Sequence, residues 1–182
     1  MRQARNRRTA QGFTLLETMI ALVILAVGVL GLAAMLADSL SYMQSSQDGF
    51  IAQQKAEEAA EAIYTAKYTN NATFAQLSNN TAGNPAGLFL TGPQPLLVPG
   101  PDGLVGSVAD AGGTPAAIIY PGPDGKLGTA DDVQERLGSF RRTIAISPVA
   151  GYTSLNQVVI TVTYTTGRFN RSYSLTTYVS AN

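Results

Sequence analysis

The stretch GFTLLETMIALVILAVGVLGLAAMLA, residues 12–37, decides the fold of the N-terminal part of this chain. Within it, the 19 residues 19–37 carry no polar side chain. As a helix, a segment of that length extends about 28 Å, close to the thickness of the hydrocarbon core of a bilayer. The stretch therefore predicts one membrane-spanning helix.

Four arginines precede this apolar stretch, and they lie within the first eight residues: Arg2, Arg5, Arg7 and Arg8. Basic residues flanking a membrane helix stay on the cytoplasmic side. The sequence therefore predicts a single-pass membrane protein whose C-terminus lies outside the cytoplasm.

The composition excludes several classes of protein. The chain has 182 residues with 12 basic and 12 acidic side chains, no cysteine and no histidine. It therefore has no thiol nucleophile, no disulfide and no imidazole base or ligand. The zero net charge also argues against a broad basic face for nucleic acid. We predict a protein that is not an enzyme and does not bind nucleic acid.

Glu17 is unusual, because a carboxylate near the start of an apolar helix is disfavoured by about 2–3 kcal/mol unless it is neutralised. A plain secretory signal keeps its apolar region free of acid. If the chain were cut after Gly12, the new amine of Phe13 would supply a positive charge near Glu17. In a packed helical assembly, Glu17 of one subunit could pair with the amine of its neighbour and fix their register.

The run from Gly12 to Glu17, followed by residues 18–25, resembles the leader and methylation motif of type IV prepilins. Residues 21–32 and, more weakly, residues 168–179 are similar to minor pilins of the PilV type. The resemblance implies a leader of residues 1–12 that prepilin peptidase removes by cleavage between Gly12 and Phe13. It also implies N-methylation of Phe13 and a role for Glu17 in assembly.

The same resemblance implies a location and partners for the chain. The subunit would be anchored in the inner membrane before an assembly platform transfers it into a filament. That pilus filament, at the cell surface or in the periplasm, would contain other pilin subunits. The implied fold is pilin-like, with a long N-terminal helix packed on a small antiparallel sheet.

The helical pattern continues beyond the membrane segment. Small and apolar residues recur on one face at helical spacing: Ala52, Ala56, Ala59, Ala60 and Ile63. Small side chains on that face would let a sheet lie close to the helix. We predict one helix from about Thr14 to Lys67, with an apolar half at 13–37 and an amphipathic half at 38–67.

The rest of the chain predicts a connecting region and then a sheet. Residues 68–136 are rich in glycine, proline and asparagine, and we expect a short helix around residues 73–77 with one or two small strands. Residues 137–182 alternate with a period of two in three segments, 140–147, 158–165 and 169–179. A tight turn at 166–167 would join the last two strands. The predicted fold class is α+β.

An internal repeat relates residues 99–110 to residues 121–132, with seven of twelve aligned positions identical. Glycines at fixed offsets let each loop fold back so that acids at its two ends converge. A hard cation such as Ca²⁺ takes oxygen ligands of this kind. The second copy, with Asp124, Asp131 and Asp132, is the candidate calcium loop. The alternative is two polar turns that bind no metal.

Three functions remain open from the sequence. The favoured one is a minor pilin subunit of a type IV pilus, and the second is a pseudopilin of a type II secretion system. The third is a membrane-anchored enzyme that would use Asp131 and Glu135 as acid and base. The lack of histidine and cysteine argues against that third function.

Overall fold

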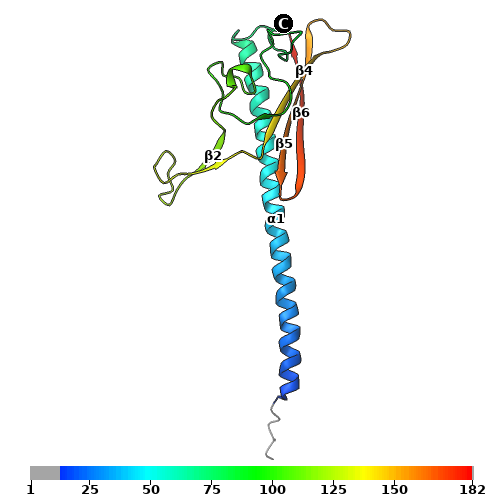
Figure 1. The fold of residues 1–182 in the computed structure, drawn as a ribbon, viewed down its shortest axis with the longest axis vertical. Helices are drawn as coiled ribbons and strands as arrows, with labels where there is room; N and C mark the ends of the chain where they lie inside the picture. The colour runs from blue at the N-terminus through cyan, green and yellow to red at the C-terminus, as the bar shows by residue number, and fades with distance from the viewer. Residues whose placement is uncertain (1–12, 182) are drawn as a thin grey trace, which may run out of the picture. The chain divides into compact units, whose positions relative to one another are not determined.

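The computed structural model describes residues 13–181 and contains one long helix, one short 3₁₀ helix and six strands (Figure 1). The helix α1 covers Leu15–Tyr68, and the 3₁₀ helix η1 covers Val108–Asp110. The strands are β1 Gln94–Pro95, β2 Ala117–Tyr120, β3 Val133–Arg136, β4 Arg141–Pro148, β5 Leu155–Thr166 and β6 Phe169–Ser180. The predicted α+β class is confirmed.

The helix α1 has nearly the bounds that the sequence predicts. Thr14 precedes its first turn, and the Thr14 hydroxyl oxygen accepts a hydrogen bond from the Glu17 N–H at 3.2 Å. A threonine in this position replaces a partner that the first helical N–H groups lack. After Tyr68 the chain turns at Asn70, which has a positive φ of 58°. Asparagine tolerates this left-handed conformation better than most residues, and it helps to end the helix.

The chain divides into two compact units at residues 43 and 44, within α1. Each unit is described by itself. The described part of the first unit is residues 13–43, which are exposed throughout. The second unit contains the rest of α1, both sheets and all the buried residues.

The larger sheet of the second unit has four antiparallel strands in the order β1-β4-β5-β6. Strands β5 and β6 form a long hairpin that closes at the pair Thr166 and Phe169, with Gly167 at a φ of 61° in the turn. The three strands and the hairpin predicted from the sequence are confirmed. The short edge strand β1 comes from the connecting region, where Gln94 lies opposite Arg142.

The core lies between the small-residue face of α1 and the sheet. All five residues that the sequence placed on that face are at most 7% exposed. They pack in one cluster with apolar residues of the sheet, among them Ile144, Val158, Ile160 and Val162. The predicted face is therefore confirmed, and the alanines allow the sheet to approach the helix closely.

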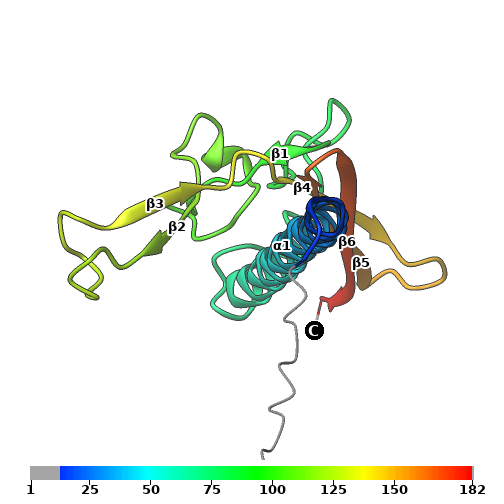
Figure 2. The same ribbon diagram turned by 90° about the horizontal axis from the view of Figure 1, so that it is seen from below.

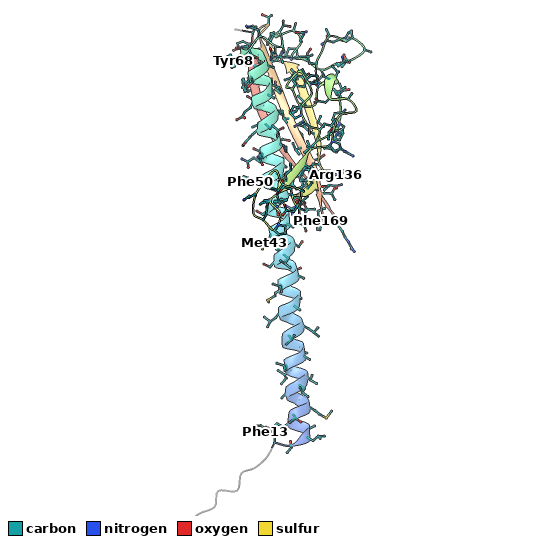
Figure 3. The ribbon with its side chains drawn as sticks, turned by 90° about the vertical axis from the view of Figure 1, so that its left-hand side faces the viewer. Phe13, Met43, Phe50, Tyr68, Arg136 and Phe169 are labelled. Carbon is teal, nitrogen blue, oxygen red and sulfur yellow. The ribbon has the colours of Figure 1, made fainter. Side chains whose placement is uncertain are left out.

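Three polar contacts join α1 to the sheet at successive positions along the helix. The Thr166 hydroxyl donates to the Asp48 carboxylate at 2.6 Å. Farther along, the buried Arg142 guanidinium donates to the Lys55 carbonyl at 3.3 Å. Near the end of the helix, the Tyr64 hydroxyl donates to the Tyr178 carbonyl at 3.0 Å. Consistent with this order, Phe169 lies at the Phe50 end of the unit, away from Tyr68 (Figure 3).

The connecting region differs from the prediction at residues 73–77, which form a turn instead of a short helix. The Gln76 side chain accepts hydrogen bonds from both the N–H and the hydroxyl of Thr73, at 3.0 and 2.9 Å. Together with the hydrogen bond from the Gln76 N–H to the Thr73 hydroxyl, this pair is a capping box, which starts a helical turn. The turn ends at once, where the Gln76 carbonyl accepts a hydrogen bond from the Leu88 N–H at 3.0 Å.

The second sheet is a two-stranded projection made of β2 and β3. Together with the loop of residues 121–132, these strands form what we call the arm. The arm and the β5–β6 hairpin extend on opposite sides of α1 (Figures 1 and 2). The Gln47 amide donates to the Tyr120 hydroxyl at 3.2 Å, so the arm is attached to α1 at the end of β2.

Candidate functional site

The first turn of α1 carries the residues to which the sequence assigned a role. Thr14 and Glu17 have the spacing of a helix-capping pair. Glu17 lies in the first turn, where a carboxylate opposes the partial positive charge of the helix N-terminus. Glu17 is exposed, and Phe13 is 83% exposed. The predicted leader, including Gly12, lies outside the described residues.

The apolar side chains of residues 13–37 are left uncovered by the described part of the chain. They point away from the helix on all sides (Figure 3), and every residue from 13 to 43 is exposed. By length and composition this part of α1 can cross a membrane. A helix that is apolar all round is stable only where lipid or other helices cover it and exclude water. The first unit therefore requires an environment that the chain itself does not provide.

Gly28 and Gly31 lie within this exposed part of α1, and the helix continues through both. A Cβ atom added at either position would meet no atom within 4 Å. Contacts within the described chain therefore do not explain two residues that each weaken a helix by about 1 kcal/mol relative to alanine. Small residues are common where helices pack closely in membranes.

Comparison with known families bears on the same segment. The model for the prokaryotic N-terminal methylation motif matches residues 7–33. The chain carries the N-terminal methylation motif of type IV prepilins. No curated protein and no solved structure matches the chain significantly. The motif and the apolar helix identify a prepilin-type segment, which fits a subunit anchored in the inner membrane.

Beyond this motif, the chain contains an internal repeat that is also a repeat of structure. Three hydrogen bonds recur at the aligned positions of both copies. In residues 99–110 they join Gly103 N–H to Gly100 carbonyl (3.0 Å), Leu104 N–H to Asp102 carboxylate (3.1 Å) and Gly106 N–H to Asp110 carboxylate (2.6 Å). In residues 121–132 they join Gly125 N–H to Gly122 carbonyl (2.9 Å), Lys126 N–H to Asp124 carboxylate (2.8 Å) and Gly128 N–H to Asp132 carboxylate (2.7 Å). The two loops share one set of turns.

The first loop is built into the second unit. Asp110 is only 2% exposed. Its carboxylate accepts hydrogen bonds from the backbone N–H groups of Gly100, Gly106 and Ser107, at 2.7, 2.6 and 3.1 Å. A buried carboxylate is stable when donors of this kind surround it. Asp110 therefore closes the loop, a role that its repeat position alone does not reveal.

The second loop lies in the arm and is exposed. The Asp131 carboxylate accepts hydrogen bonds from the Thr129 hydroxyl at 2.7 Å and from the Asp124 N–H at 3.3 Å. These two hydrogen bonds lower the pKa of Asp131. In the described part of the chain, no three acidic side chains come close enough to form a metal-binding group. Calcium binding by Asp124, Asp131 and Asp132 stays a prediction.

Asp131 and Glu135, the predicted acid and base of an enzyme, have different partners. Asp131 bonds within its own loop, whereas Glu135 acts on Tyr120 of the neighbouring strand. Partial desolvation and the charge of Glu135 raise the pKa of Tyr120. Within residues 13–181, no hydrogen bond joins the two carboxylates. The loop geometry therefore gives no support to an acid–base pair.

The repeat allows a matched test of how much the burial of an aspartate contributes to the free energy of unfolding. We expect Asp110→Asn to lower the free energy of unfolding by about 2 kcal/mol or more, because the amide NH₂ group would oppose backbone donors in a buried site. Asp132→Asn, at the aligned position that is only half-buried, should change it by less than about 0.5 kcal/mol. The measurement is urea unfolding of the full chain in detergent. Equal effects of the two variants would contradict the assigned role of Asp110.

Calcium binding is tested separately by thermal unfolding of the full chain with calcium or with a chelator. If the ion binds, free calcium at a hundred times its dissociation constant should stabilise the protein by about 2.7 kcal/mol. Asp131→Ala and Asp132→Ala should then remove the rise in melting temperature, whereas Asp102→Ala should not. An identical melting temperature of the wild type in both conditions would leave the loop a metal-free turn.

Proposed function

We propose that the chain is a minor pilin subunit of a type IV pilus. One observation supports this most strongly: the prepilin methylation motif coincides with an apolar helical segment whose described residues are all exposed. A helix of this kind is suited first to the bilayer and then to the interior of a bundle of like helices. The subunit would act as a structural component, and we assign it no catalytic residue.

Processing is the first step of the proposed function. Prepilin peptidase would cleave between Gly12 and Phe13 and so remove the four arginines of the leader. Those arginines would hold the N-terminus in the cytoplasm until cleavage. The amine of Phe13 would then be methylated, which keeps its positive charge. The inner-membrane assembly platform would finally transfer the processed subunit into the filament.

Glu17 would set the register of the subunit within the filament. Two pairings are open to its carboxylate after cleavage: the amine of its own chain, four residues away, and the amine of a neighbour. Removing both charges from water is favourable only when each finds a partner. The neighbour's amine can be reached only at one axial offset, so this pairing would reject other registers. The exposed position of Glu17 leaves it accessible to such a partner.

Gly28 and Gly31 suit the same assembly. Without side chains they would let neighbouring helices approach closely inside the filament. A second hypothesis is that they allow the helix to melt locally on assembly, since α1 has no proline between residues 13 and 67. In both cases the reason for these glycines lies in contacts with other subunits, because contacts within the chain provide none.

The second candidate function is a pseudopilin of a type II secretion system. Its processing and helix packing would follow the same physical rules, so neither the motif nor the fold separates the two. The likeness of residues 21–32 to PilV-type minor pilins favours the pilus. Neighbouring genes discriminate: extension and retraction ATPases accompany a pilus, whereas an outer-membrane secretin with secretion genes accompanies a pseudopilin.

The proposed processing fixes the mature N-terminus. We expect the intact mass of the subunit, purified from membranes or filaments, to correspond to a chain that begins at a methylated Phe13. A host without prepilin peptidase should yield the uncut chain as the control. A mature chain that begins near Ala33, or an uncut Met1 in filaments, would rule the proposal out.

The register role of Glu17 is tested by assembly. We expect Glu17→Ala and Glu17→Gln to leave the amount of subunit in membranes nearly unchanged but to reduce its content in sheared filaments about tenfold or more, since an unpaired buried charge costs several kcal/mol. Glu17→Asp, which keeps the charge, should retain more incorporation. Equal filament content for wild type and Glu17→Gln would remove the charge pairing from the mechanism.

A further inference from the structure

An open groove of about 430 Å³ lies at the hairpin end of the larger sheet. Two arginines, Arg141 of β4 and Arg171 of β6, line it. The other polar side chains of its wall are uncharged: Ser139, Thr163, Tyr164, Thr165, Asn170 and Ser172. The groove therefore combines two cationic groups with neutral hydrogen-bonding groups, which suits an anionic partner.

The two guanidinium groups have no ion-pair partner among the residues that the structure describes. Among residues 13–181, the ion pair present joins Lys55 to Glu58, and no carboxylate lies within 4.0 Å of Arg141 or Arg171. Both arginines are exposed, and Arg168 adds a third positive charge in the adjoining hairpin turn. An arginine presents a planar fork of donors that matches a carboxylate. Carboxylates on a partner would complete this groove.

The loop of the arm carries the complementary groups. Asp124, Asp131 and Asp132 supply three negative charges against the one positive charge of Lys126. Leu127, between them in sequence, is 65% exposed, whereas Val105 at the aligned position of the first copy is 1% exposed. The same loop thus has an internal packing partner in one copy and none in the other. An apolar side chain surrounded by charged groups is typical of a protein–protein contact.

The loop is also preorganised for docking. Its backbone is held by hydrogen bonds to Asp124, Asp131 and Asp132, as described above. A loop that is already ordered loses less conformational entropy on binding.

The arm and the β5–β6 hairpin lie on opposite sides of α1 (Figures 1 and 2), so the loop and the groove of one subunit face different neighbours. A contact between two different surfaces of identical chains is heterologous, and it repeats without closing unless the rotation forms a ring. The arrangement therefore allows a lateral contact wherever two copies of the chain lie side by side, in the membrane or in the filament.

We propose that the groove lined by Arg141 and Arg171 receives the acidic arm loop of a second copy of this chain. This inference rests on the proposed function, because it names a contact between subunits outside the helical bundle. The carboxylates of the loop pair with the two arginines, and Leu127 is covered against the sheet of the neighbour. Residues 121–132 are the docking element. The groove that receives them lies where β4 and β6 begin.

The experiment uses two differently tagged full-length copies in one cell. The chain has no cysteine, so single cysteines can be introduced without a background reaction. One copy carries Leu127→Cys in the loop, and the other carries Ser172→Cys in the groove, which leaves all charges intact. We expect oxidation to give a disulfide-linked dimer with both tags, in membranes or in sheared filaments. The matched control pairs Leu127→Cys with Ser147→Cys, at the far end of β4, and should give little dimer.

Charge variants then test the chemistry of the contact. Arg171→Glu in the groove copy should lower the dimer yield about fivefold or more, as expected for two exposed ion pairs. By itself, Asp131→Arg in the loop copy should also lower the dimer yield. Combined with Arg171→Glu in the groove copy, it should restore part of that yield.

Four results would overturn the proposal: no dimer in either fraction, equal yield with the Ser147→Cys control, no effect of charge reversal, or cross-links only to a different protein. The proposed function fails independently. If the dimer forms in membranes while the processed subunit never enters filaments, the docking contact stands and the pilus role does not.

Discussion

The close packing of the alanine face of α1 on the sheet is the interaction on which the second unit depends. A helix can lie near a sheet only if the side chains between them are small, and Ala52, Ala56 and Ala59 are fully buried there. Larger residues of the sheet, such as Ile160 and Val162, fill the remaining volume. Because the helix is nearer than bulky side chains would allow, long polar side chains can reach across the interface.

Arg142 illustrates the consequence of that short distance. Its side chain is 3% exposed and reaches the carbonyl of Lys55 on the helix. Burial lowers the pKa of Arg142, and the charges of Glu58 and Asp110 oppose that shift. Within the described residues its Nε atom has no hydrogen-bond partner. The guanidinium therefore depends on charges from both the helix and the first loop, which links the folding of that loop to the helix–sheet core.

Periodicity explains which parts of the fold could be predicted. The alternation in β4, β5 and β6 and the spacing of Ala56, Ala59 and Ile63 both reflect one-sided burial, so a pattern in the sequence records it. The sequence of the arm shows no such periodic pattern, because all four residues of β3 are exposed. The pairing of β3 with β2 is also local. The burial of Asp110 could not be predicted either. Its aligned partner Asp132 has the same local sequence pattern but is only half-buried, so only the tertiary surroundings separate them.

The motif at the N-terminus could be recognised from the sequence because its function depends on a few individual residues in a fixed order. A carboxylate such as Glu17 beside an apolar helical segment is disfavoured in lipid unless it is neutralised, and in the proposed assembly the amine of a neighbour would neutralise it. The apolar side chains beside it gain little when they move from lipid into a bundle of helices, since both environments are apolar. Close packing and charge pairing must therefore supply the difference. In the proposed filament, one charge pair at Glu17 of each subunit would thus set the register of the helix, because its apolar side chains favour no particular register.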